Sequence, residues 1–383
     1  MLFLVSMMWR QTLAIVQLDR LINNVRLLKA ELAPSVQMMA TVKADGYGHG
    51  AVAVSQAVIA AGADQLGVAT VEEAVALRQA GITVPILVYG ALPEHAARTL
   101  VDFEIMATVA SHKDVYLLSE AGRSMRKAAR VHLKVDTGMG RLGVRSIEDM
   151  LMVLMQMAES PFVELAGLFT HLSSADEMHT PDGRVYTEMQ RQRFIEMLDG
   201  AKRAGFQIPI AHAANSAALL WDSAYHFDMV RPGIAMYGYH PAVSWQQTID
   251  LQPVLQLRSA ITRIAQMSAG EVVSYGRTHV TVKDERVATV AAGYGDGIPR
   301  ALANRAFVEV NGTLAPIVGT ICMDQLMVNV TGIDAEVGDA VIIYSGQKHS
   351  KASLQNHADI LDTISYELLC RITARVPRRY TGS

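Results

Sequence analysis

The sequence has few cysteines, no excess of one charge and no basic run, and each of these absences excludes a class of protein. Its two cysteines, Cys322 and Cys370, form no Cys-x-x-Cys motif, and no histidine cluster has the spacing of metal ligands. This argues against structural zinc and a disulfide framework, and we expect a reducing compartment. A net charge of −3 without a basic face argues against nucleic acid as a partner. We therefore expect a small-molecule substrate.

Signals for membranes and export are also missing. No stretch reaches the roughly 18 uninterrupted apolar residues that a membrane helix needs, so we expect no membrane partner. Residues 1–8 are apolar, but Trp9 and Arg10 follow them without a small-residue cleavage site, and no basic segment precedes them. This is a poor signal peptide, and it predicts a cytoplasmic protein. Residues 1–8 receive no role.

The length of 383 residues exceeds the usual size of one hydrophobic core. Two domains, or one large barrel with an appendage, are therefore expected. Half of the residues are hydrophobic and 19% are charged, which is typical of compact globular proteins and not of disordered ones.

From about Leu18 to Gly238, helical periods alternate with short apolar runs, which predicts repeated βα units. A (β/α)8 barrel fits eight strands, but a doubly wound open sheet gives similar patterns, so periodicity leaves both open. The expected strands are Gln37–Ala44, Gln65–Thr70, Pro85–Gly90, Glu104–Ala110, Val131–Thr137, Leu165–His171, Ile208–Ala213 and Met229–Tyr237. Two helical stripes are expected to face the core: Ile147, Met150, Leu151, Leu154, Met155 and Ala158; and Phe194, Met197, Leu198 and Ala201.

After about His240 the pattern changes to alternating, strand-like runs, which predicts a mostly β region. Strands are expected at Val287–Val290 and Val341–Tyr344. Asn311 and Gly312 predict a hairpin turn, because both residues tolerate the positive φ that such turns require. A last helix is expected from Ser353 through Ile372, followed by a basic tail.

The strongest local signal is the segment 40–50, which reads Ala-Thr-Val-Lys-Ala-Asp-Gly-Tyr-Gly-His-Gly. Lys43 ends a buried apolar strand, where its charge is costly unless it is paired or used chemically. Burial lowers the pKa of a lysine and favours the free amine that forms an imine. A lysine whose end reaches solvent would give the same pattern. The three glycines between Gly46 and Gly50 favour a loop that a ligand approaches closely.

Further motifs accompany this segment, and together they resemble the alanine racemase family along almost the whole chain. They are Lys134–Gly143, Thr170–Asp176, Ala214–Ala217, Arg231–Gly238, Val273–Gly276, Gly293–Arg300 and Cys322–Gln325.

The resemblance implies an N-terminal (β/α)8 TIM-type barrel over residues 12–240 and a C-terminal mostly-β domain over 241–383. It also implies a head-to-tail homodimer in which the second domain contributes to the partner's active site. The implied activity is that of a pyridoxal 5'-phosphate-dependent isomerase that interconverts L-alanine and D-alanine by two bases. This would supply D-alanine for the peptidoglycan of the cell wall.

The resemblance also assigns the two bases. Lys43 holds pyridoxal phosphate as an imine and exchanges the α-proton on the D face. Tyr275 of the partner subunit exchanges it on the L face, and His171 is hydrogen-bonded to this tyrosine. Two bases are needed because a proton that leaves one face of a planar carbanion must be replaced from the other face.

In the family the residue that corresponds to Arg231 faces the pyridine nitrogen, and the one that corresponds to His212 supports it. A guanidinium can only donate hydrogen bonds, so the ring nitrogen stays unprotonated and withdraws less charge. This favours reprotonation over transamination and decarboxylation. The phosphate contacts implied by the resemblance are Tyr47, Ser216, Gly233, Ile234 and Tyr366.

Lys134 alternates with His132 and Asp136 on one face of a strand, and we expect that face to point into the barrel. Lys134 would then share a site of low dielectric constant with Arg141. By resemblance Lys134 is carbamylated, which converts a repelling ammonium into an anion; alternatively, Asp136 alone neutralises it. Arg141 and the backbone N–H of Met323 match the groups that bind the substrate carboxylate.

Three alternatives to an alanine racemase have related sequence features. A related decarboxylase places a carboxylate on the pyridine nitrogen and carries a Gly-Gly-Gly phosphate loop, where this chain has Arg231 and Ala214-Asn215-Ser216. A barrel-only pyridoxal phosphate carrier has no β-rich half with a residue like Tyr275. A racemase of serine or another small amino acid stays open, because the width of a pocket cannot be read from sequence.

Overall fold

A computed structural model describes residues 11–242 and 249–382, so residues 1–8 lie outside the described part. Its backbone contacts divide the chain into two units. The barrel unit comprises Leu21–Gly46 and Ala51–Leu251. The β unit comprises the segment up to Arg20, Tyr47–Gly50 and the chain from Gln252 onward. The domain boundaries expected from the sequence, 12–240 and 241–383, stay a prediction.

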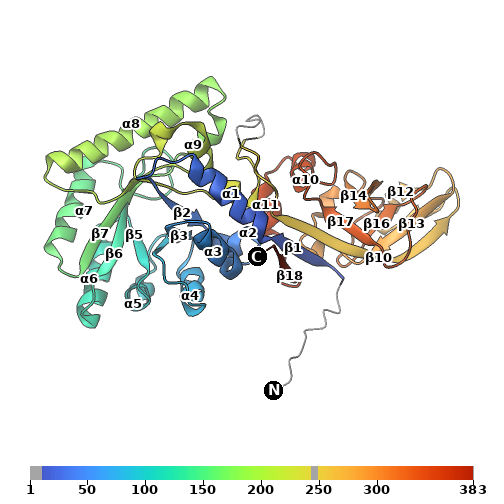
Figure 1. Ribbon diagram of the computed structural model, residues 1–383, viewed down its shortest axis with the longest axis horizontal. Helices are drawn as coiled ribbons and strands as arrows, with labels where there is room; N and C mark the ends of the chain where they lie inside the picture. Colours follow the sequence, from blue (N-terminus) through green and yellow to red (C-terminus); the bar gives the residue numbers. More distant parts are fainter. Residues whose placement is uncertain (1–10, 243–248, 383) are drawn as a thin grey trace, which may run out of the picture. The chain divides into compact units, whose positions relative to one another are not determined.

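The barrel unit contains a parallel sheet in the order β8-β7-β6-β5-β4-β3-β2-β9. Two hydrogen bonds join its end strands: Asp228 N–H donates to Ala211 O at 3.0 Å, and Arg231 N–H to Ala214 O at 2.9 Å. The sheet is therefore a nearly closed barrel surrounded by helices, and the open-sheet alternative is excluded (Figure 1). The strands are β2 (Gln37–Thr41), β3 (Gln65–Val68), β4 (Ile86–Val88), β5 (Met106–Val109), β6 (Ala129–Lys134), β7 (Val163–Phe169), β8 (Ala211–His212) and β9 (Met229–Val230).

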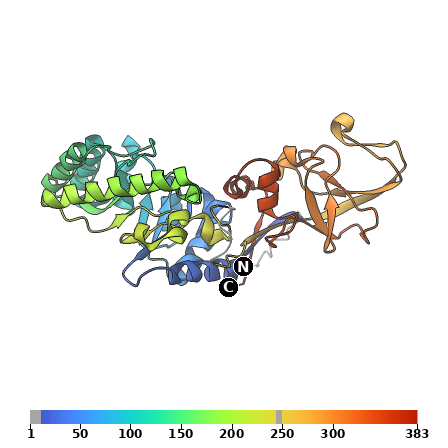
Figure 2. The same ribbon diagram turned by 90° about the horizontal axis from the view of Figure 1, so that it is seen from above.

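All eight expected strands are confirmed, although β9 is shorter than predicted because Ile234–Tyr237 forms a 3-10 turn, η4. In Figure 2 the long helix α8 runs along the outside of the barrel. The remaining elements of this part of the chain are α1 (Leu18–Ala30), α2 (Lys43–Tyr47), α3 (Ala51–Ala60), α4 (Val71–Gln79), η1 (Glu94–Ala96), α5 (Ala97–Asp102), α6 (His112–Met125), α7 (Ile147–Glu159), η2 (Ala175–Glu177), α8 (Pro181–Arg203), α9 (Ser216–Trp221) and η3 (Ser223–Tyr225).

The predicted core face of α7 was partly wrong. Its buried residues are Met150, Val153, Leu154 and Met157, whereas Met155 is 49% exposed. Apolar side chains occupy every position from 150 to 155, so their spacing does not single out one face. The stripe predicted for α8 is confirmed, with Leu198 half-buried and Phe194, Met197 and Ala201 buried.

An apolar cluster fills the barrel interior, and polar residues lie next to it, further along the same strands. Its buried members are Met39, Leu87, Met106, Ala166, Phe169 and Met229. Because side chains on a strand alternate with period two, the residue two positions further on points into the same interior. Thr41 follows Met39 in this way, and Arg231 follows Met229. Polar residues therefore line the interior at the carboxyl ends of the strands.

The β unit is built on a sheet in the order β15-β14-β17-β10-β1-β18, and β13 joins β10 to β16. Asn311 and Gly312 have φ values of 49° and 75°, which confirms the predicted hairpin. The strands are β1 (Leu13–Gln17), β10 (Leu255–Met267), β11 (Val272–Val273), β12 (His279–Val280), β13 (Glu285–Val290), β14 (Phe307–Val310), β15 (Thr313–Pro316), β16 (Leu326–Asn329), β17 (Ala340–Tyr344) and β18 (Arg378–Thr381). Its 3-10 turns are η5 (Tyr275–Arg277), η6 (Tyr294–Asp296) and η7 (Arg300–Leu302).

The single last helix predicted from the sequence was wrong. Two short helices occupy this region, α10 (Leu354–Ile360) and α11 (Ser365–Cys370). Asp362 between them has a φ of 54°, and Thr363 N–H donates to Ala358 O at 3.0 Å. This left-handed helix ending depends on one backbone angle, which hydrophobic spacing does not reveal. The basic tail forms β18, which pairs in parallel with β1.

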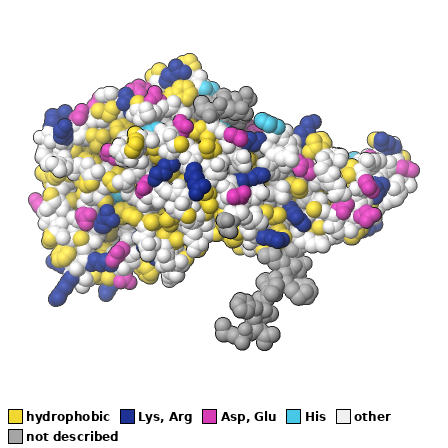
Figure 3. Space-filling model, viewed as in Figure 1, with side chains coloured by type: hydrophobic (Ala, Val, Ile, Leu, Met, Phe, Trp, Pro, Cys, Tyr) yellow, Lys and Arg dark blue, Asp and Glu magenta, His cyan; other side chains and the backbone are white. Residues whose placement is uncertain are grey.

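No helix among residues 11–242 and 249–382 is long and apolar enough to cross a membrane. The same described residues contain no group of three or more His, Cys, Asp or Glu side chains that could hold a metal ion. On the face drawn in Figure 3, acidic and basic side chains are scattered among neutral and hydrophobic ones.

Candidate active site

Arg231 lies buried at the centre of the polar interior, directly after β9. Its Nη1 donates to Nδ1 of His212 at 2.8 Å, and its Nη2 to the carbonyl oxygens of Thr170 (2.8 Å) and Ala213 (3.0 Å). Nη2 also lies 3.4 Å from Nδ1 of His171. Burial lowers the pKa of Arg231 to about 10, so it is cationic at neutral pH. No described residue accepts from its Nε–H, which leaves this donor for a ligand.

The proton positions of two buried histidines follow from Arg231. Since a guanidinium only donates, Nδ1 of His212 accepts, and the proton of His212 is on Nε2. This Nε2–H donates to Nδ1 of His132 at 2.8 Å, so His132 carries its own proton on Nε2. Burial lowers the pKa of His132 to about 3 and that of His212 well below its ordinary value. Both histidines are therefore neutral, and together they orient the guanidinium.

Phe169 connects this network to Lys134. Its ring stacks on the ring of His212 with centroids 4.8 Å apart, and Lys134 Nζ lies 4.2 Å from its centroid. Within the described part of the chain, Nζ has no hydrogen-bond acceptor and no ion-pair partner. Burial, and then the charges of Arg231 and Arg141, lower the pKa of Lys134 to about 7. A large share of this amine is therefore neutral at physiological pH.

Asp136 shapes the loop that carries Arg141 instead of pairing with Lys134. Its carboxylate accepts the backbone N–H groups of Gly138 at 3.0 Å and of Gly140 at 2.9 Å. The face shared by Lys134 and Asp136 is buried, as the alternation predicted. The alternative in which Asp136 alone neutralises Lys134 therefore finds no direct ion pair among the described residues.

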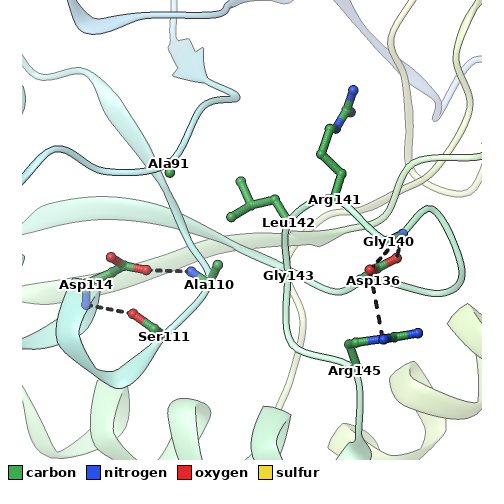
Figure 4. A pocket seen from close by; sticks show the side chains of 10 residues that line it. All are labelled: Ala91, Ala110, Ser111, Asp114, Asp136, Gly140, Arg141, Leu142, Gly143 and Arg145. Carbon is green, nitrogen blue, oxygen red and sulfur yellow. Dashed lines mark hydrogen bonds and ion pairs between the residues drawn. The ribbon is translucent and has the colours of Figure 1, made fainter.

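A hollow of about 500 Å³ opens beside this loop (Figure 4). The side chain of Arg141 extends away from Asp136, and no described residue pairs with its guanidinium. A free guanidinium favours a carboxylate ligand, because its N–H groups match the two carboxylate oxygens. The hollow is lined by Ala91, Ala110, Ser111, Asp114, Asp136, Gly140, Arg141, Leu142, Gly143 and Arg145.

Lys43 is half-buried at the carboxyl end of β2 and is the first residue of α2. This element is a single unusual turn. Its residues Ala44, Asp45 and Gly46 have φ values of 52°, 54° and 61°, which is the left-handed conformation. The turn directs the chain away from the strand end, so that Lys43 stands at the mouth of the barrel.

His171 marks the point on which the positive charges converge. Burial, and then the charges of Arg231, Lys134, Arg141 and Lys43, lower the pKa of His171 well below its ordinary value. The imidazole is therefore neutral, and four basic side chains act on one small region. Such a concentration of positive charge suits a ligand that carries both a phosphate and a carboxylate.

Ser216, Gly233 and Ile234 meet where β8 and β9 end. The buried hydroxyl of Ser216 accepts the N–H groups of Gly233 (2.8 Å) and Ala235 (3.3 Å). Asn215 caps α9 by accepting two N–H groups of its first turn at 3.1 Å each. Backbone N–H groups and a hydroxyl at the ends of the last barrel strands are typical of phosphate sites.

Tyr47 and Tyr366 lie together in the β unit, with ring centroids 6.0 Å apart. Tyr47 belongs to the short segment Tyr47–Gly50, and the backbone around it requires a glycine. A Cβ on Gly48 would lie 2.3 Å from the carbonyl oxygen of Leu369, and its φ is 78°. The two predicted phosphate tyrosines are therefore neighbours, and Tyr47 is buried in a closely packed part of this unit.

Tyr275 is highly exposed, with 73% of its surface accessible. Its backbone is nevertheless held on both sides. Ser274 has a left-handed φ of 66°, and its hydroxyl donates to Thr320 O at 2.6 Å. The hydroxyl of Thr320 donates to Tyr275 O at 2.8 Å. The backbone is thus fixed while the phenol projects outward.

Met323 presents its backbone N–H in the same unit. Its carbonyl oxygen accepts from Gly295 N–H at 2.8 Å and from Arg375 Nη2 at 3.1 Å. No described residue accepts from the N–H of Met323, and the residue is 54% exposed. This N–H is therefore available to an anionic ligand.

The structure places the predicted residues in two groups. The barrel unit brings together Lys43, Lys134, Arg141, His171, His212, Ser216, Arg231, Gly233 and Ile234, and the β unit holds Tyr47, Tyr275, Met323 and Tyr366. Sequence reasoning gave no role to Phe169, although it precedes His171 at strand spacing, or to His132. Thr320 carried no recognisable signal, because it acts through a backbone group.

Comparison with known proteins identifies the family of the chain. Residues 16–241 match the family model described as alanine racemase, N-terminal domain, and residues 254–380 match the one described as alanine racemase, C-terminal domain. The chain is 42% identical to an alanine racemase of Symbiobacterium thermophilum, over 97% of this chain and 98% of that protein. It is 40% identical to an alanine racemase of Desulfosudis oleivorans, over 95% of each chain.

Solved structures give the same result. The crystal structure of alanine racemase from Bacillus anthracis with bound L-Ala-P matches with a TM-score of 0.91 at 36% identity, over 97% of this chain and 95% of that one. The enzyme from a D-cycloserine-producing Streptomyces lavendulae matches with a TM-score of 0.92 at 36% identity, over 98% of each chain. This chain therefore belongs to the alanine racemase family.

Proposed function

We propose that this chain interconverts L-alanine and D-alanine with pyridoxal 5'-phosphate as its cofactor, and with Lys43 and Tyr275 as the two bases. As a member of the alanine racemase family, the chain is an isomerase. The observation that carries the proposal is the Arg231 network. It leaves one donor, Nε–H, on a buried guanidinium whose terminal nitrogens already have acceptors.

The residues of the site fit this cofactor. Lys43 would hold it covalently through Nζ, and the Nε–H of Arg231 would donate to the pyridine nitrogen. The phosphate would be held by Ser216, Gly233 and Ile234, together with Tyr47 and Tyr366. When bound, pyridoxal phosphate supplies an electron sink for the charge left after the α-proton is removed.

Lys43 and Tyr275 divide the proton transfers between the two faces of the substrate. The Nζ of Lys43 holds the proton on the D face, and the Oη of Tyr275 holds it on the L face. His171 supports the phenol. Because Arg231 donates to Nδ1 of His171, the proton of this neutral imidazole is on Nε2. The Nε2–H of His171 would donate a hydrogen bond to the Oη of Tyr275 and orient the phenol toward the α-carbon.

The substrate carboxylate would bind the guanidinium of Arg141 and the N–H of Met323, both of which have no partner among the described residues. We propose that Lys134 is carbamylated and that its negative charge orients Arg141. A pKa of about 7 supports this, because only the neutral amine reacts with carbon dioxide.

The assembly we propose is a head-to-tail homodimer in which each active site takes Tyr275 and Met323 from the partner chain. Both residues belong to the β unit, and both are exposed in the isolated chain. We further propose that the enzyme acts in the cytoplasm and supplies D-alanine for peptidoglycan, as its resemblance to the alanine racemase family implies.

The test is a steady-state assay of the purified protein, supplied with pyridoxal phosphate, on both enantiomers of alanine and of serine. We expect both alanine enantiomers to be converted into one another, with a much lower kcat/KM for serine. Equal or faster conversion of serine would mean that the substrate assignment is wrong. Lys43→Ala is the control, and it should convert neither amino acid.

A further inference from the structure

The chain makes a left-handed turn directly after Lys43. Ala44, Asp45, Gly46 and Tyr47 all have φ values between 52° and 61°. Residues with a Cβ avoid this conformation, because the Cβ comes too close to the following carbonyl oxygen, and a run of four is rare. Only Gly46 adopts it without a steric penalty. Something outside the turn must therefore hold it.

Two side-chain contacts hold it: Asp45 Oδ1 accepts the N–H of Ala51 at 2.8 Å, and Glu73 binds Ala44, the residue next to Lys43. The Oε1 of Glu73 accepts the backbone N–H of Ala44 at 2.6 Å. Its Oε2 accepts the N–H groups of Ala69 (2.7 Å) and Thr70 (3.3 Å), which follow the end of β3. One carboxylate thus joins the end of the neighbouring strand to the residue next to Lys43. Bonds from a charged acceptor are short and strong, which suits this task.

The chain before Lys43 is fixed by separate contacts. Val42 N–H donates to Gly67 O at 2.9 Å. The hydroxyl of Thr41 lies 3.2 Å from Tyr89 Oη, and the hydroxyl of Tyr237 donates to Thr41 O at 3.1 Å. The strand end is therefore anchored independently, and the side-chain contact on the residue that follows Lys43 comes from Glu73.

We propose that Glu73 is a positioning residue for Lys43. Its carboxylate keeps Ala44 left-handed, and this backbone direction aims Nζ of Lys43 at the cofactor. If Ala44 relaxes to a right-handed conformation, its N–H turns away from Glu73 and the peptide that links it to Lys43 rotates. This inference rests on the proposed function, because it assumes that Lys43 binds pyridoxal phosphate.

A purely structural role for Glu73 can be separated from this one. Glu73 is also the third residue of α4 and forms a capping box with Thr70, whose hydroxyl accepts Glu73 N–H at 3.3 Å. The capping box uses Oε2, whereas the bond to Ala44 uses Oε1. Thr70→Ala removes the cap without touching Ala44. It is therefore the matched control for any change at Glu73.

The experiment compares Glu73→Gln, Thr70→Ala, Ala44→Gly and the double variant Glu73→Gln with Ala44→Gly, each as the holoenzyme. Glutamine keeps the size but offers one accepting oxygen, and its amide group cannot accept from the remaining N–H groups. The readouts are the absorbance of lysine-bound pyridoxal phosphate, the dissociation constant of the cofactor, kcat and the thermal midpoint.

We expect Glu73→Gln to weaken cofactor binding and kcat by about tenfold or more, because a small misplacement of a reacting group is costly. Thr70→Ala should lower the thermal midpoint by about as much as Glu73→Gln does, but it should leave the cofactor absorbance unchanged. The double variant should recover much of the activity lost in Glu73→Gln, because glycine at position 44 adopts the left-handed conformation without the hydrogen bond to Glu73. Glu73→Asp is a second variant: its carboxylate is too short to bridge both segments, so a similar loss is expected.

Two results overturn the inference. One is a Glu73→Gln enzyme that matches Thr70→Ala in cofactor absorbance and affinity. The other is a double variant no better than Glu73→Gln alone. Failure of the proposed function is distinguishable, since the wild-type protein would then show no lysine-bound cofactor before any variant is compared.

Discussion

Burial lowers the pKa of Lys134 and so makes its amine available for carbamylation. The aromatic ring of Phe169 lies beneath its Nζ, and no described anion pairs with it. Its pKa of about 7, against 10.5 for an ordinary lysine, follows first from burial and then from nearby arginines. Below pH 7 the amine is protonated and cannot react with carbon dioxide. Above pH 7 the neutral amine dominates, and carbamate formation is favoured.

We therefore predict that activity depends on carbon dioxide and that this dependence is strongest at low pH. Enzyme equilibrated without carbon dioxide should lose activity, and bicarbonate should restore it. The concentration of dissolved carbon dioxide needed for restoration should rise as pH falls below about 7, because a smaller share of the amine is then neutral. A carbamate carbon signal from ¹³C-labelled bicarbonate reports the modification directly. Lys134→Gln should show neither the signal nor the response, and a wild-type enzyme that behaves like this variant would contradict carbamylation.

At the scale of residues, the sequence reveals groups whose own side chains carry out the chemistry. Lys43 and Arg231 are unusual where they stand, since a cation at the end of an apolar strand needs an explanation. Glu73 is not unusual, because glutamate is common in the first turn of a helix. Its bond to Ala44 depends on where two strand ends lie relative to each other, and that distance is a property of the fold.

The turn η5 is the element that presents Tyr275. Ser274 is left-handed with a φ of 66°, a conformation that persists only where neighbouring groups enforce it. Thr320 provides part of this enforcement through its hydroxyl, which donates to Tyr275 O at 2.8 Å, while its carbonyl oxygen accepts from Ser274. Thr320 therefore fixes the backbone of Tyr275 and, through it, the position of the phenol.

Thr320→Val removes the hydroxyl at nearly constant volume, and we predict about a tenfold loss of kcat/KM. The loss must be equal in both directions, because the two enantiomers of alanine have the same free energy. The direction-specific readout is the isotope effect: α-deuterated L-alanine should show a larger effect than in wild type, whereas α-deuterated D-alanine should not. Thr320→Ser keeps the hydroxyl and should retain wild-type values. Equal isotope changes for both enantiomers would mean that Thr320 does not act through Tyr275.

Elements were predictable where pattern and length agree. The eight barrel strands are short apolar runs between turn residues, and each was found. The errors arose where apolar residues surround a helix, as in α7, or where one backbone angle ends it, as at Asp362. A barrel forms here because β9 pairs with β2, which is far away in the sequence, and also hydrogen-bonds to β8. Local periodicity contains no information on such closure.

At the scale of the whole molecule, a single chain leaves two of the proposed active-site residues exposed to solvent. Tyr275 and Met323 project from the β unit with most of their surfaces accessible. Val272 and Val280 on the small sheet of β11 and β12 are also about half exposed, at 46% and 50%. Apolar groups gathered around a reactive side chain are typical of a surface that another chain covers. The proposed homodimer provides such a cover.

Mixed dimers test this shared site. Lys43→Ala lacks one base and Tyr275→Phe lacks the other, so each homodimer should be inactive. In a mixed dimer with shared sites, one site carries both defects. The other combines the intact Lys43 of the Tyr275→Phe chain with the intact Tyr275 of the Lys43→Ala chain. Since a symmetric dimer has two equivalent sites, activity should return to about half of the wild-type value per mixed dimer.

Different affinity tags on the two variants allow the mixed dimers to be purified away from both parents before the assay. A mixture of wild-type chains with the two tags is the control for any effect of the tags. If both bases instead act within one chain, every site in the mixed dimer retains one defect, and the preparation stays as inactive as its parents. That result would refute the shared site and would leave the assignment of Lys43 intact, because cofactor absorbance from the Tyr275→Phe chain would persist.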